Sequence, residues 1–230
     1  MKGLLKKSLS QSAIFTSEEK LDALVEFFAM LKSTNEHTNL TRIVSDEDAV
    51  EKHFRDSLEG VRFISDNICL LDVGSGGGFP AIPLSIVRDD ISVTMIDSTG
   101  KKVDFLNNVC NTLSLNAHAL HVRAEDYAMT DDRESFDVVT ARAVASLPTL
   151  LEYCLPFVKV GGLFIAYKTD VAEIDMAKKA LSVLGGKIEK IHPYTIGGGD
   201  NRALFIIKKV TPTPPKYPRG QGKPKQKPIQ

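Results

Sequence analysis

Four glycines within five residues follow an apolar segment in the stretch LLDVGSGGGFPAIP, which covers residues 70–83. Glycine has no Cβ atom, so a loop of this kind can adopt unusual dihedral angles and let its backbone touch a ligand. The segment after the loop has the pattern of a helix, whose first N–H groups are free to bind a polar or anionic group. These residues therefore predict a small-molecule site built largely from backbone.

Two classes of ligand compete for this loop. Read from Gly76, the loop gives a dinucleotide fingerprint, Gly76-x-Gly78-x-x-Ala81, with Asp97 about 20 residues on as the ribose ligand. That register begins four residues beyond Asp72, which is late for a strand-to-helix turn. Read from Asp72, the stretch D-V-G-S-G-G-G-F is similar to the first motif of the class I S-adenosylmethionine-dependent methyltransferases. In those enzymes the acid anchors the loop and the methionine end of the cofactor.

The acids that follow the next two predicted strands favour the second reading. Asp97, in MIDS, comes where a carboxylate can accept hydrogen bonds from both ribose hydroxyls. Ala124 and Glu125, in VRAEDY, come where a backbone N–H and a carboxylate can read the adenine edge. A single acid in such a place is usually a cap or a surface charge. Three sites at the ends of three consecutive strands predict one S-adenosylmethionine site, because ligands bind at the carboxyl ends of parallel strands.

Cations follow the fourth and fifth predicted strands. Arg142, in TARAVASLP, and Lys168, at the end of AYK, would face the cofactor and are the candidate catalytic residues. Either could be an ordinary surface cation, but together they indicate an anionic or electron-rich substrate such as RNA. The stretch after the fourth strand lacks the Asn/Asp-Pro-Pro-aromatic turn that is typical of exocyclic amino methylation. Neither Cys110 nor Cys154 falls at a strand end, where pyrimidine C5 methylation needs a thiol.

The elements that would position these residues alternate between short apolar strands and helices from residue 68 onward. This alternation predicts an open α/β sheet of parallel strands covered on both faces. The last two strands have a short link and are expected to form an antiparallel hairpin at the sheet edge. The predicted strands are 68–73, 91–96, 118–122, 136–140, 162–167, 187–192 and 203–208, and the predicted helices are 80–88, 101–114, 147–157 and 171–184.

Two further segments flank this predicted domain of residues 67–210. Residues 1–66 are expected to be helical and to pack on it. Thr16 and Glu19 resemble a capping box for a helix that ends near Asn35, and Ser45 is expected to begin another helix. Residues 211–230 form a basic, proline-rich tail in which neither helix nor sheet is expected to continue.

Composition and charge point to a cytoplasmic protein that meets phosphates. No apolar run approaches a membrane span, and three scattered cysteines fit a reducing compartment. No Cys/His spacing calls for a metal. The net charge of zero divides into 22 basic and 29 acidic residues in 1–207 and seven basic residues without an acid in 208–230. A basic tail commonly binds phosphates, although a solvated end explains it equally well.

Eight motifs spread from residue 39 to residue 228 resemble one family, glucose-inhibited division protein B. They are NLTRI (39–43), KHFRDSL (52–58), LLDVGSGGGFPAIPLSI (70–86), MIDSTGKKVDFL (95–106), RAED (123–126), TARAVASL (140–147), AYK (166–168) and YPRGQGKPKQKP (217–228). Members of this family are bacterial methyltransferases that modify N7 of a guanosine in small-subunit ribosomal RNA. The resemblance implies a class I methyltransferase fold with seven mostly parallel strands, S-adenosylmethionine as cofactor, and ribosomal RNA or a ribosomal particle as partner; we expect a monomer.

The resemblance also assigns residues to roles. It implies cofactor contacts at Gly74, Phe79, Ala124, Glu125 and Arg142, to which the physical argument adds Asp72, Gly76 and Asp97. Arg142 could instead contact an RNA phosphate; we favour the cofactor. Candidates for the RNA side are Asn39, Thr41, Arg42, His53, Lys168, Arg219, Lys223 and Lys225, although a lone histidine such as His53 is more often structural.

The sequence leaves three functions open for the chain. Methyl transfer to guanine N7 fits the absence of acid–base motifs, because N7 is a lone pair without a proton to remove, and catalysis then rests on proximity and orientation. The register from Gly76 allows an NAD(P)-dependent oxidoreductase, and the basic tail allows a non-catalytic RNA-binding module.

Overall fold

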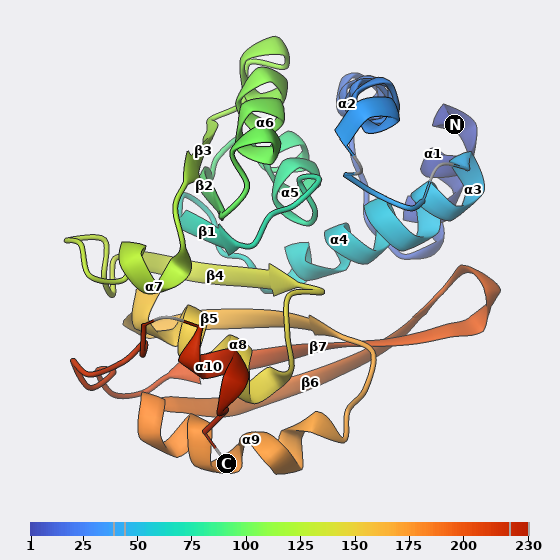
Figure 1. Cartoon of the computed structure of the whole chain (residues 1–230). Coiled ribbons are helices and arrows are strands. Elements are labelled where there is room, and N and C mark those ends of the chain that lie inside the picture. The colour runs from blue at the N-terminus through green and yellow to red at the C-terminus, as the bar shows by residue number, and fades with distance from the viewer. Residues whose placement is uncertain (39, 44, 221, 230) are drawn as a thin grey trace.

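The computed structural model of the chain describes residues 1–38, 40–43, 45–220 and 222–229. Within these ranges one seven-stranded sheet has the order β3-β2-β1-β4-β5-β7-β6 (Figure 1). The first five strands pair in parallel, whereas β7 runs antiparallel to both β5 and β6. The predicted mostly parallel sheet with an antiparallel edge hairpin is therefore confirmed. The strands are β1 (Cys69–Val73), β2 (Ser92–Asp97), β3 (Ala117–His121), β4 (Phe136–Arg142), β5 (Val158–Lys168), β6 (Gly186–Ile196) and β7 (Asp200–Lys209).

Helices cover both faces of the sheet, as a buried parallel sheet requires. Alternate residues along a strand enter two different apolar clusters, so Leu70 packs with α5 and α6 while Leu71 packs with α8 and α9. The N-terminal helices add to the first layer, and a short α7 to the second (Figure 1). These helices are α5 (Ala81–Val87), α6 (Gly100–Thr112), α7 (Ala124–Tyr127), α8 (Leu147–Cys154), which continues into the 3₁₀ turn η3 (Leu155–Phe157), and α9 (Glu173–Leu184).

The N-terminal region is helical, as the pattern predicts. It begins with α1 (Lys2–Gln11) and α2 (Glu18–Thr38). A continuous helical segment, residues 46–63, follows and is made of α3 (Asp46–Ala49), the π-helical turn η1 (Val50–Arg55), α4 (Asp56–Leu58) and the 3₁₀ turn η2 (Glu59–Phe63). Ser45 is the N-cap of this segment, because its Oγ accepts from the Asp48 N–H at 3.2 Å. The capping box at Thr16 and Glu19 was wrong: the Lys20 N–H donates to Ser17 Oγ at 3.3 Å, so α2 starts one residue later.

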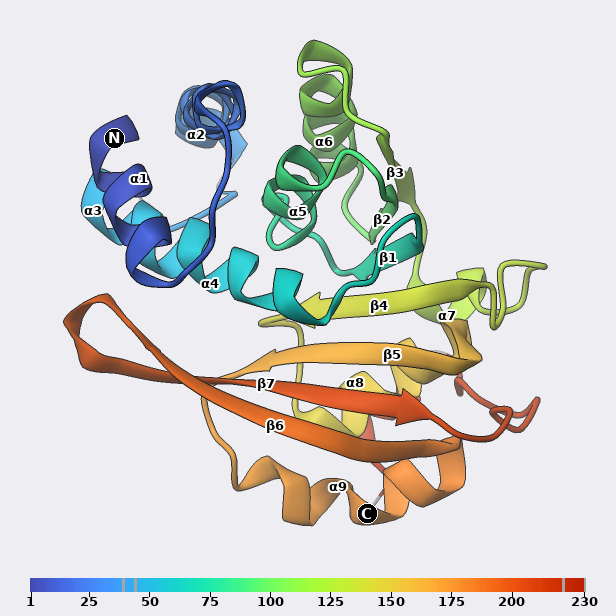
Figure 2. The ribbon, with the colours of Figure 1, turned by 180° about the vertical axis from the view of Figure 1, so that it is seen from behind.

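The edge hairpin is longer than predicted and reaches the N-terminal region. Figure 2 shows β6 and β7 extending past the sheet toward the N-terminal helices. The 3₁₀ turn η4 (Gly197–Gly199) joins them, and the Gly197 N–H donates to Glu51 Oε2 at 2.8 Å. The predicted absence of helix from the C-terminal tail was also wrong, because α10 (Lys223–Gln226) forms there with Pro224 in its first turn, where proline is tolerated.

Candidate active site

The glycine loop after β1 adopts conformations that other residues rarely adopt. Gly74 has φ +75°, Gly76 has φ +56° and Gly78 has φ +96°. A Cβ atom on Gly74 would lie 2.7 Å from Val144 Cγ2, whereas one on Gly78 would meet the core side chains Ile82 and Leu106. Gly78 therefore faces the core, which does not suit the glycine that must approach a pyrophosphate in the dinucleotide register. Gly74 and Gly76 line the cavities described next.

Two adjoining cavities lie at the carboxyl ends of β1 and β2, and Gly74 and Asp97 line both. Asp97 Oδ2 accepts from the Gly76 N–H at 3.0 Å, and Oδ1 accepts from the Thr99 N–H at 2.9 Å. An ionised carboxylate has about four acceptor positions. Two of them therefore stay available for ligand hydroxyls, which is the ribose role that the sequence predicts for Asp97.

The first cavity, of about 260 Å³, extends from Gly74 toward the start of α7 and is lined there by Ala124 and Glu125. Glu125 is 6 % exposed, and its Oε1 has no hydrogen-bond partner within the described ranges. The Arg123 guanidinium is 3.6 Å from this oxygen. A buried acceptor without a donor is costly, so it indicates a missing ligand group. An adenine amino group is a suitable donor, and the Ala124 N–H, in the first helical turn, has no intrahelical acceptor.

Asp72 lies beneath the glycine loop and lines neither cavity. Thr140 Oγ1 donates to Asp72 Oδ1 at 2.7 Å, and within the described part of the chain Asp72 Oδ2 has no hydrogen-bond partner. Burial raises the pKa of this carboxyl to about 6. The Ser75 hydroxyl donates to the Asp72 carbonyl at 3.2 Å. This position can support the loop, but it offers no surface that a bound molecule could touch.

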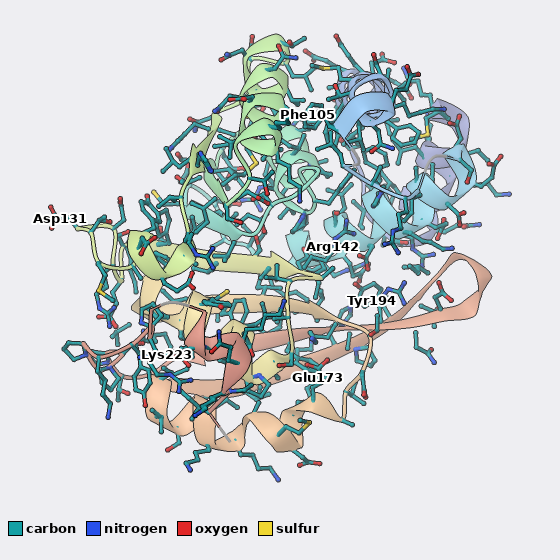
Figure 3. All side chains as sticks on the ribbon, viewed as in Figure 1. Phe105, Asp131, Arg142, Glu173, Tyr194 and Lys223 are labelled. Atoms are coloured by element: carbon teal, nitrogen blue, oxygen red, sulfur yellow. The ribbon has the colours of Figure 1, made fainter. Side chains whose placement is uncertain are left out.

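The second cavity, of about 430 Å³, lies between the glycine loop and the N-terminal region. Its walls include Thr41, His53, Phe79 and Arg142. The imidazole of His53 stacks on the Phe79 ring with centroids 4.2 Å apart, and the Arg142 guanidinium lies 5.3 Å from the same ring. Figure 3 shows Arg142 at the end of β4 beside the N-terminal helices. The structure therefore brings together residues from four segments of the sequence.

Hydrogen bonds fix the protonation state of His53. Arg142 Nη2 lies 3.2 Å from His53 Nδ1, and a guanidinium can only donate, so Nδ1 is the acceptor. The proton is therefore on Nε2, which donates to Thr41 Oγ1 at 2.8 Å. Burial, and then the charge of Arg142, lower the pKa of His53 to about 3. His53 is thus a neutral histidine with both ring nitrogens occupied.

Arg142 also forms an ion pair that the sequence did not predict. Its Nη1 donates to Asp56 Oδ2 at 2.7 Å and to the Lys52 carbonyl at 2.9 Å. Tyr194 donates to the other oxygen of Asp56 at 2.7 Å, so both oxygens of this buried carboxylate accept a hydrogen bond. Asp56 is 86 residues from Arg142 in the sequence. The only signal for it was its position beside His53 in KHFRDSL, and that motif did not indicate its partner.

A third cavity, of about 370 Å³, adjoins the second at His53, Arg142 and Ala143 and is also lined by Lys168. Lys168 Nζ donates to the Ala145 carbonyl at 3.0 Å and is 2.8 Å from Glu173 Oε1. Its side chain is 10 % exposed. Lys168 therefore faces a cavity beside Arg142, with its charge balanced by Glu173.

Each of the other residues that are predicted to contact RNA either does not line the second or the third cavity or lies outside the described residues. Arg42 is exposed and lines none of the three cavities, and Asn39 lies outside the described residues. Lys223 is exposed on α10, while Lys225 lines the first cavity. Arg219 does not extend into solvent as a free cation, because Glu152 binds it through two carboxylate oxygens at 2.8 and 2.6 Å.

Sequence reasoning missed several residues of the site. Val144, which limits the space at Gly74, lies in the motif TARAVASL but was given no role, and Tyr153, which lines the first cavity, lies in none of the motifs. A signal did exist for Glu152, since it is the single charge in the apolar helix LPTLLEYC and a buried carboxylate needs a partner.

No described helix is both long and apolar enough to cross a bilayer, and the described residues contain no cluster of three metal-binding side chains.

Comparison with solved structures identifies proteins of similar fold. The fold is similar to that of an S-adenosylmethionine-dependent methyltransferase from Aquifex aeolicus, with a TM-score of 0.57 over 75% of this chain and 98% of that one at 16% identity. It is also similar to precorrin-6y C5,15-methyltransferase from Geobacter metallireducens, with a TM-score of 0.53 over 74% of this chain and 92% of that chain at 13% identity. The expected class I methyltransferase fold is therefore confirmed.

The sequence itself matches more closely. It is 44% identical to a ribosomal RNA small subunit methyltransferase G from Acetivibrio thermocellus, over all of this chain and 97% of that protein. It is 42% identical to the protein of the same name from Limosilactobacillus reuteri, over 97% of each chain. Residues 20–202 match the family model described as GidB, rRNA small subunit methyltransferase G. The chain therefore belongs to the rRNA small subunit methyltransferase G family.

Proposed function

We propose that this protein transfers the methyl group of S-adenosylmethionine to N7 of a guanosine in small-subunit ribosomal RNA. The names of its relatives support the ribosomal RNA of the small subunit as substrate. One observation in the chain supports N7 as the acceptor. His53, which stacks on Phe79 at the end of the glycine loop, is neutral and has both ring nitrogens occupied, so it cannot serve as a base near neutral pH.

The cofactor fits the residues of the first cavity. Asp97 offers acceptors for the ribose hydroxyls, and Glu125 Oε1, which has no hydrogen-bond donor among the described residues, offers one for the adenine amino group. Gly74 leaves space beside Val144 where a larger residue would collide. When bound, S-adenosylmethionine supplies an electrophilic methyl group. These residues would bind the molecule and orient it so that the methyl group faces the second cavity.

The second and third cavities suit an acceptor that loses no proton. In attack by guanine N7, the N7–C bond forms as the S–C bond breaks, and the positive charge passes from sulfur to the guanine ring. No base is needed, and proximity and alignment supply the rate. A new positive charge would be opposed by a free cation nearby. Arg142 is paired with Asp56 and Lys168 with Glu173, so these two cations add little net positive charge.

The candidate RNA-side residues take different places in this proposal. Thr41, His53, Arg142 and Lys168 border the cavities where a splayed guanine would enter. Exposed Arg42 and Lys223 are left for phosphates, where they would add salt-dependent affinity without sequence preference. A monomeric state and a cytoplasmic location stay predictions.

Ribosomal RNA from cells with and without the gene tests this proposal. Small-subunit RNA is digested to nucleosides, and N7-methylguanosine is quantified by mass spectrometry. We expect the RNA to lose one N7-methylguanosine per molecule when the gene is deleted and to regain it when the gene is restored. Retention of every N7-methylguanosine in the deletion strain would refute the substrate assignment, whatever the protein binds in vitro.

A further inference from the structure

The described part of the C-terminal tail, residues 211–220 and 222–229, packs on the molecule after β7. Arg133 holds its first half, donating to the Thr213 carbonyl at 2.9 Å and to the Tyr217 carbonyl at 2.8 Å. Lys209, which precedes the tail, is buried and lies 2.9 Å from Glu134 Oε1. In Figure 1 α10 lies against α8. The described part of the tail is therefore a packed segment.

An ion pair between Arg219 and a buried carboxylate fixes the second half of the tail. Glu152, on α8, is fully buried, and its Oε1 accepts from both the backbone N–H and the Nε of Arg219 at 2.8 Å. Its Oε2 accepts from Arg219 Nη2 at 2.6 Å, and the same Nη2 donates to the Lys227 carbonyl at 2.8 Å. Arg219 thus ties the segment that contains α10 to one carboxylate. Such a pair specifies position, because a buried charge without its partner is strongly unfavourable.

The ion pair and its neighbours bring α10 to the cofactor cavity. Thr149 Oγ1, on α8, donates to the Pro224 carbonyl at 3.1 Å, and Pro224 is buried. Lys225, the next residue, lines the 260 Å³ cavity together with Glu125. Tyr153, one turn along α8 from Thr149, lines it too. One wall of the cavity that Glu125 lines therefore comes from the tail.

We infer that the C-terminal tail, docked on α8 by the Glu152–Arg219 ion pair, is the outer wall of the cofactor site and that Lys225 helps to hold the adenosine half of S-adenosylmethionine. This inference rests on the proposed cofactor. A lysine suits the position, because its apolar stem can cover the face of a purine while its ammonium group stays in water. The tail then acts in cofactor binding even without RNA, a role that is separate from the phosphate binding expected from its basic sequence.

Titration calorimetry with S-adenosylhomocysteine on the full-length protein, without RNA, tests the inference. We compare the unaltered chain with Lys225→Ala and with a matched control, Lys227→Ala, whose side chain is exposed in the same tail and lines none of the cavities described. Lys225→Ala should raise the Kd roughly four- to fifteen-fold, the equivalent of withdrawing one or two methylene groups from the purine. Lys227→Ala should leave the Kd unchanged.

Undocking the tail gives a second, independent arm. Arg219→Ala removes the partner of Glu152, and the double variant Glu152→Leu/Arg219→Ala removes the whole pair without leaving a buried charge. The double variant should fold, as judged by circular dichroism and thermal melting, and still bind the ligand at least as weakly as Lys225→Ala. Normal affinity in both Lys225→Ala and the folded double variant would overturn the inference. If the unaltered protein binds neither S-adenosylhomocysteine nor S-adenosylmethionine, the proposed function itself fails.

Discussion

Replacing Glu125 by methionine should weaken cofactor binding without weakening the fold. The Oε1 of Glu125 is buried and has no hydrogen-bond partner among the described residues, and its 3.6 Å ion pair with the largely exposed Arg123 is weak, so in the free protein its removal costs little. Exchange of a poorly paired polar group for an apolar group of similar shape is close to neutral or stabilising, here by about 1 kcal/mol at most. That gain would raise the Tm by about 2–4 °C for a chain of this size.

The bound state should respond in the opposite direction. A hydrogen bond from the adenine amino group to this carboxylate contributes about 1.5–3 kcal/mol. Its loss corresponds to an increase of roughly 10- to 150-fold in the Kd. Calorimetry with S-adenosylhomocysteine measures this change, and Asp126→Asn, at the exposed neighbouring acid, is the matched control.

A purine comparison shows whether the adenine edge is the group that Glu125 recognises. Inosine carries a carbonyl in place of the amino group of adenosine. The unaltered protein should therefore prefer adenosine to inosine as a competitor, and Glu125→Met should lose the preference. An unchanged Kd would refute the assignment of Glu125 to adenine. A weaker Kd accompanied by a lower Tm would mean that the substitution acts through the fold.

Three further predictions concern the loop and the buried titratable groups. Gly74→Ala places a Cβ 2.7 Å from Val144 Cγ2 at φ +75°. Backbone strain alone should lower the stability by about 1–2 kcal/mol. Cofactor affinity, measured by calorimetry, should also fall, and adding Val144→Ala should recover only the steric part of that loss. Burial raises the pKa of Asp72 to about 6 from an ordinary value of 3.8, so the stability that its protonated form contributes is present below pH 3.8 and is lost as the pH rises through 6. Chemical unfolding of Asp72→Asn against pH should therefore show a variant that gains stability relative to the unaltered chain between pH 4 and pH 6; a pH-independent difference would contradict the raised pKa. The pKa of His53 is lowered to about 3 from 6.5, so the stability of the neutral form is present above pH 6.5 and is lost as the pH falls toward 3; NMR should find the His53 ring neutral at pH 5, and a midpoint near 6 would refute the lowered pKa.

Local patterns in the sequence were sufficient to predict the sheet and the ends of its strands. Apolar runs and helical spacing gave seven strands in nearly the observed places, and the short link before β7 gave the antiparallel hairpin. The positions of Gly74, Asp97 and Glu125 around one cavity follow from the parallel order, because the carboxyl ends of neighbouring strands meet.

Partners that are distant in the sequence could not be predicted in this way. No local pattern connects Arg142 with Asp56 or Arg219 with Glu152, because each pair forms only when separate layers of the fold come together. The tail was therefore described by its composition, as a basic and proline-rich end. Its buried ion pair and the helix at Lys223–Gln226 depend on tertiary packing against α8. The N-cap of α2 was predicted one residue too early, because Thr16 and Ser17 are adjacent candidates and only the geometry of the folded chain separates them.

Methyl transfer by the purified protein tests the central claim most directly. The substrate is small-subunit ribosomal RNA, as particles and as free RNA, from cells that lack the gene, and the donor is S-adenosylmethionine with a labelled methyl group. Borohydride reduction followed by aniline cleavage, which breaks the chain at N7-methylguanosine, locates the product. We predict label at a single guanosine and cleavage at that position, both strongly reduced by Glu125→Met at a limiting cofactor concentration. Label that is incorporated without cleavage, or no incorporation into either form of the RNA, would contradict the account.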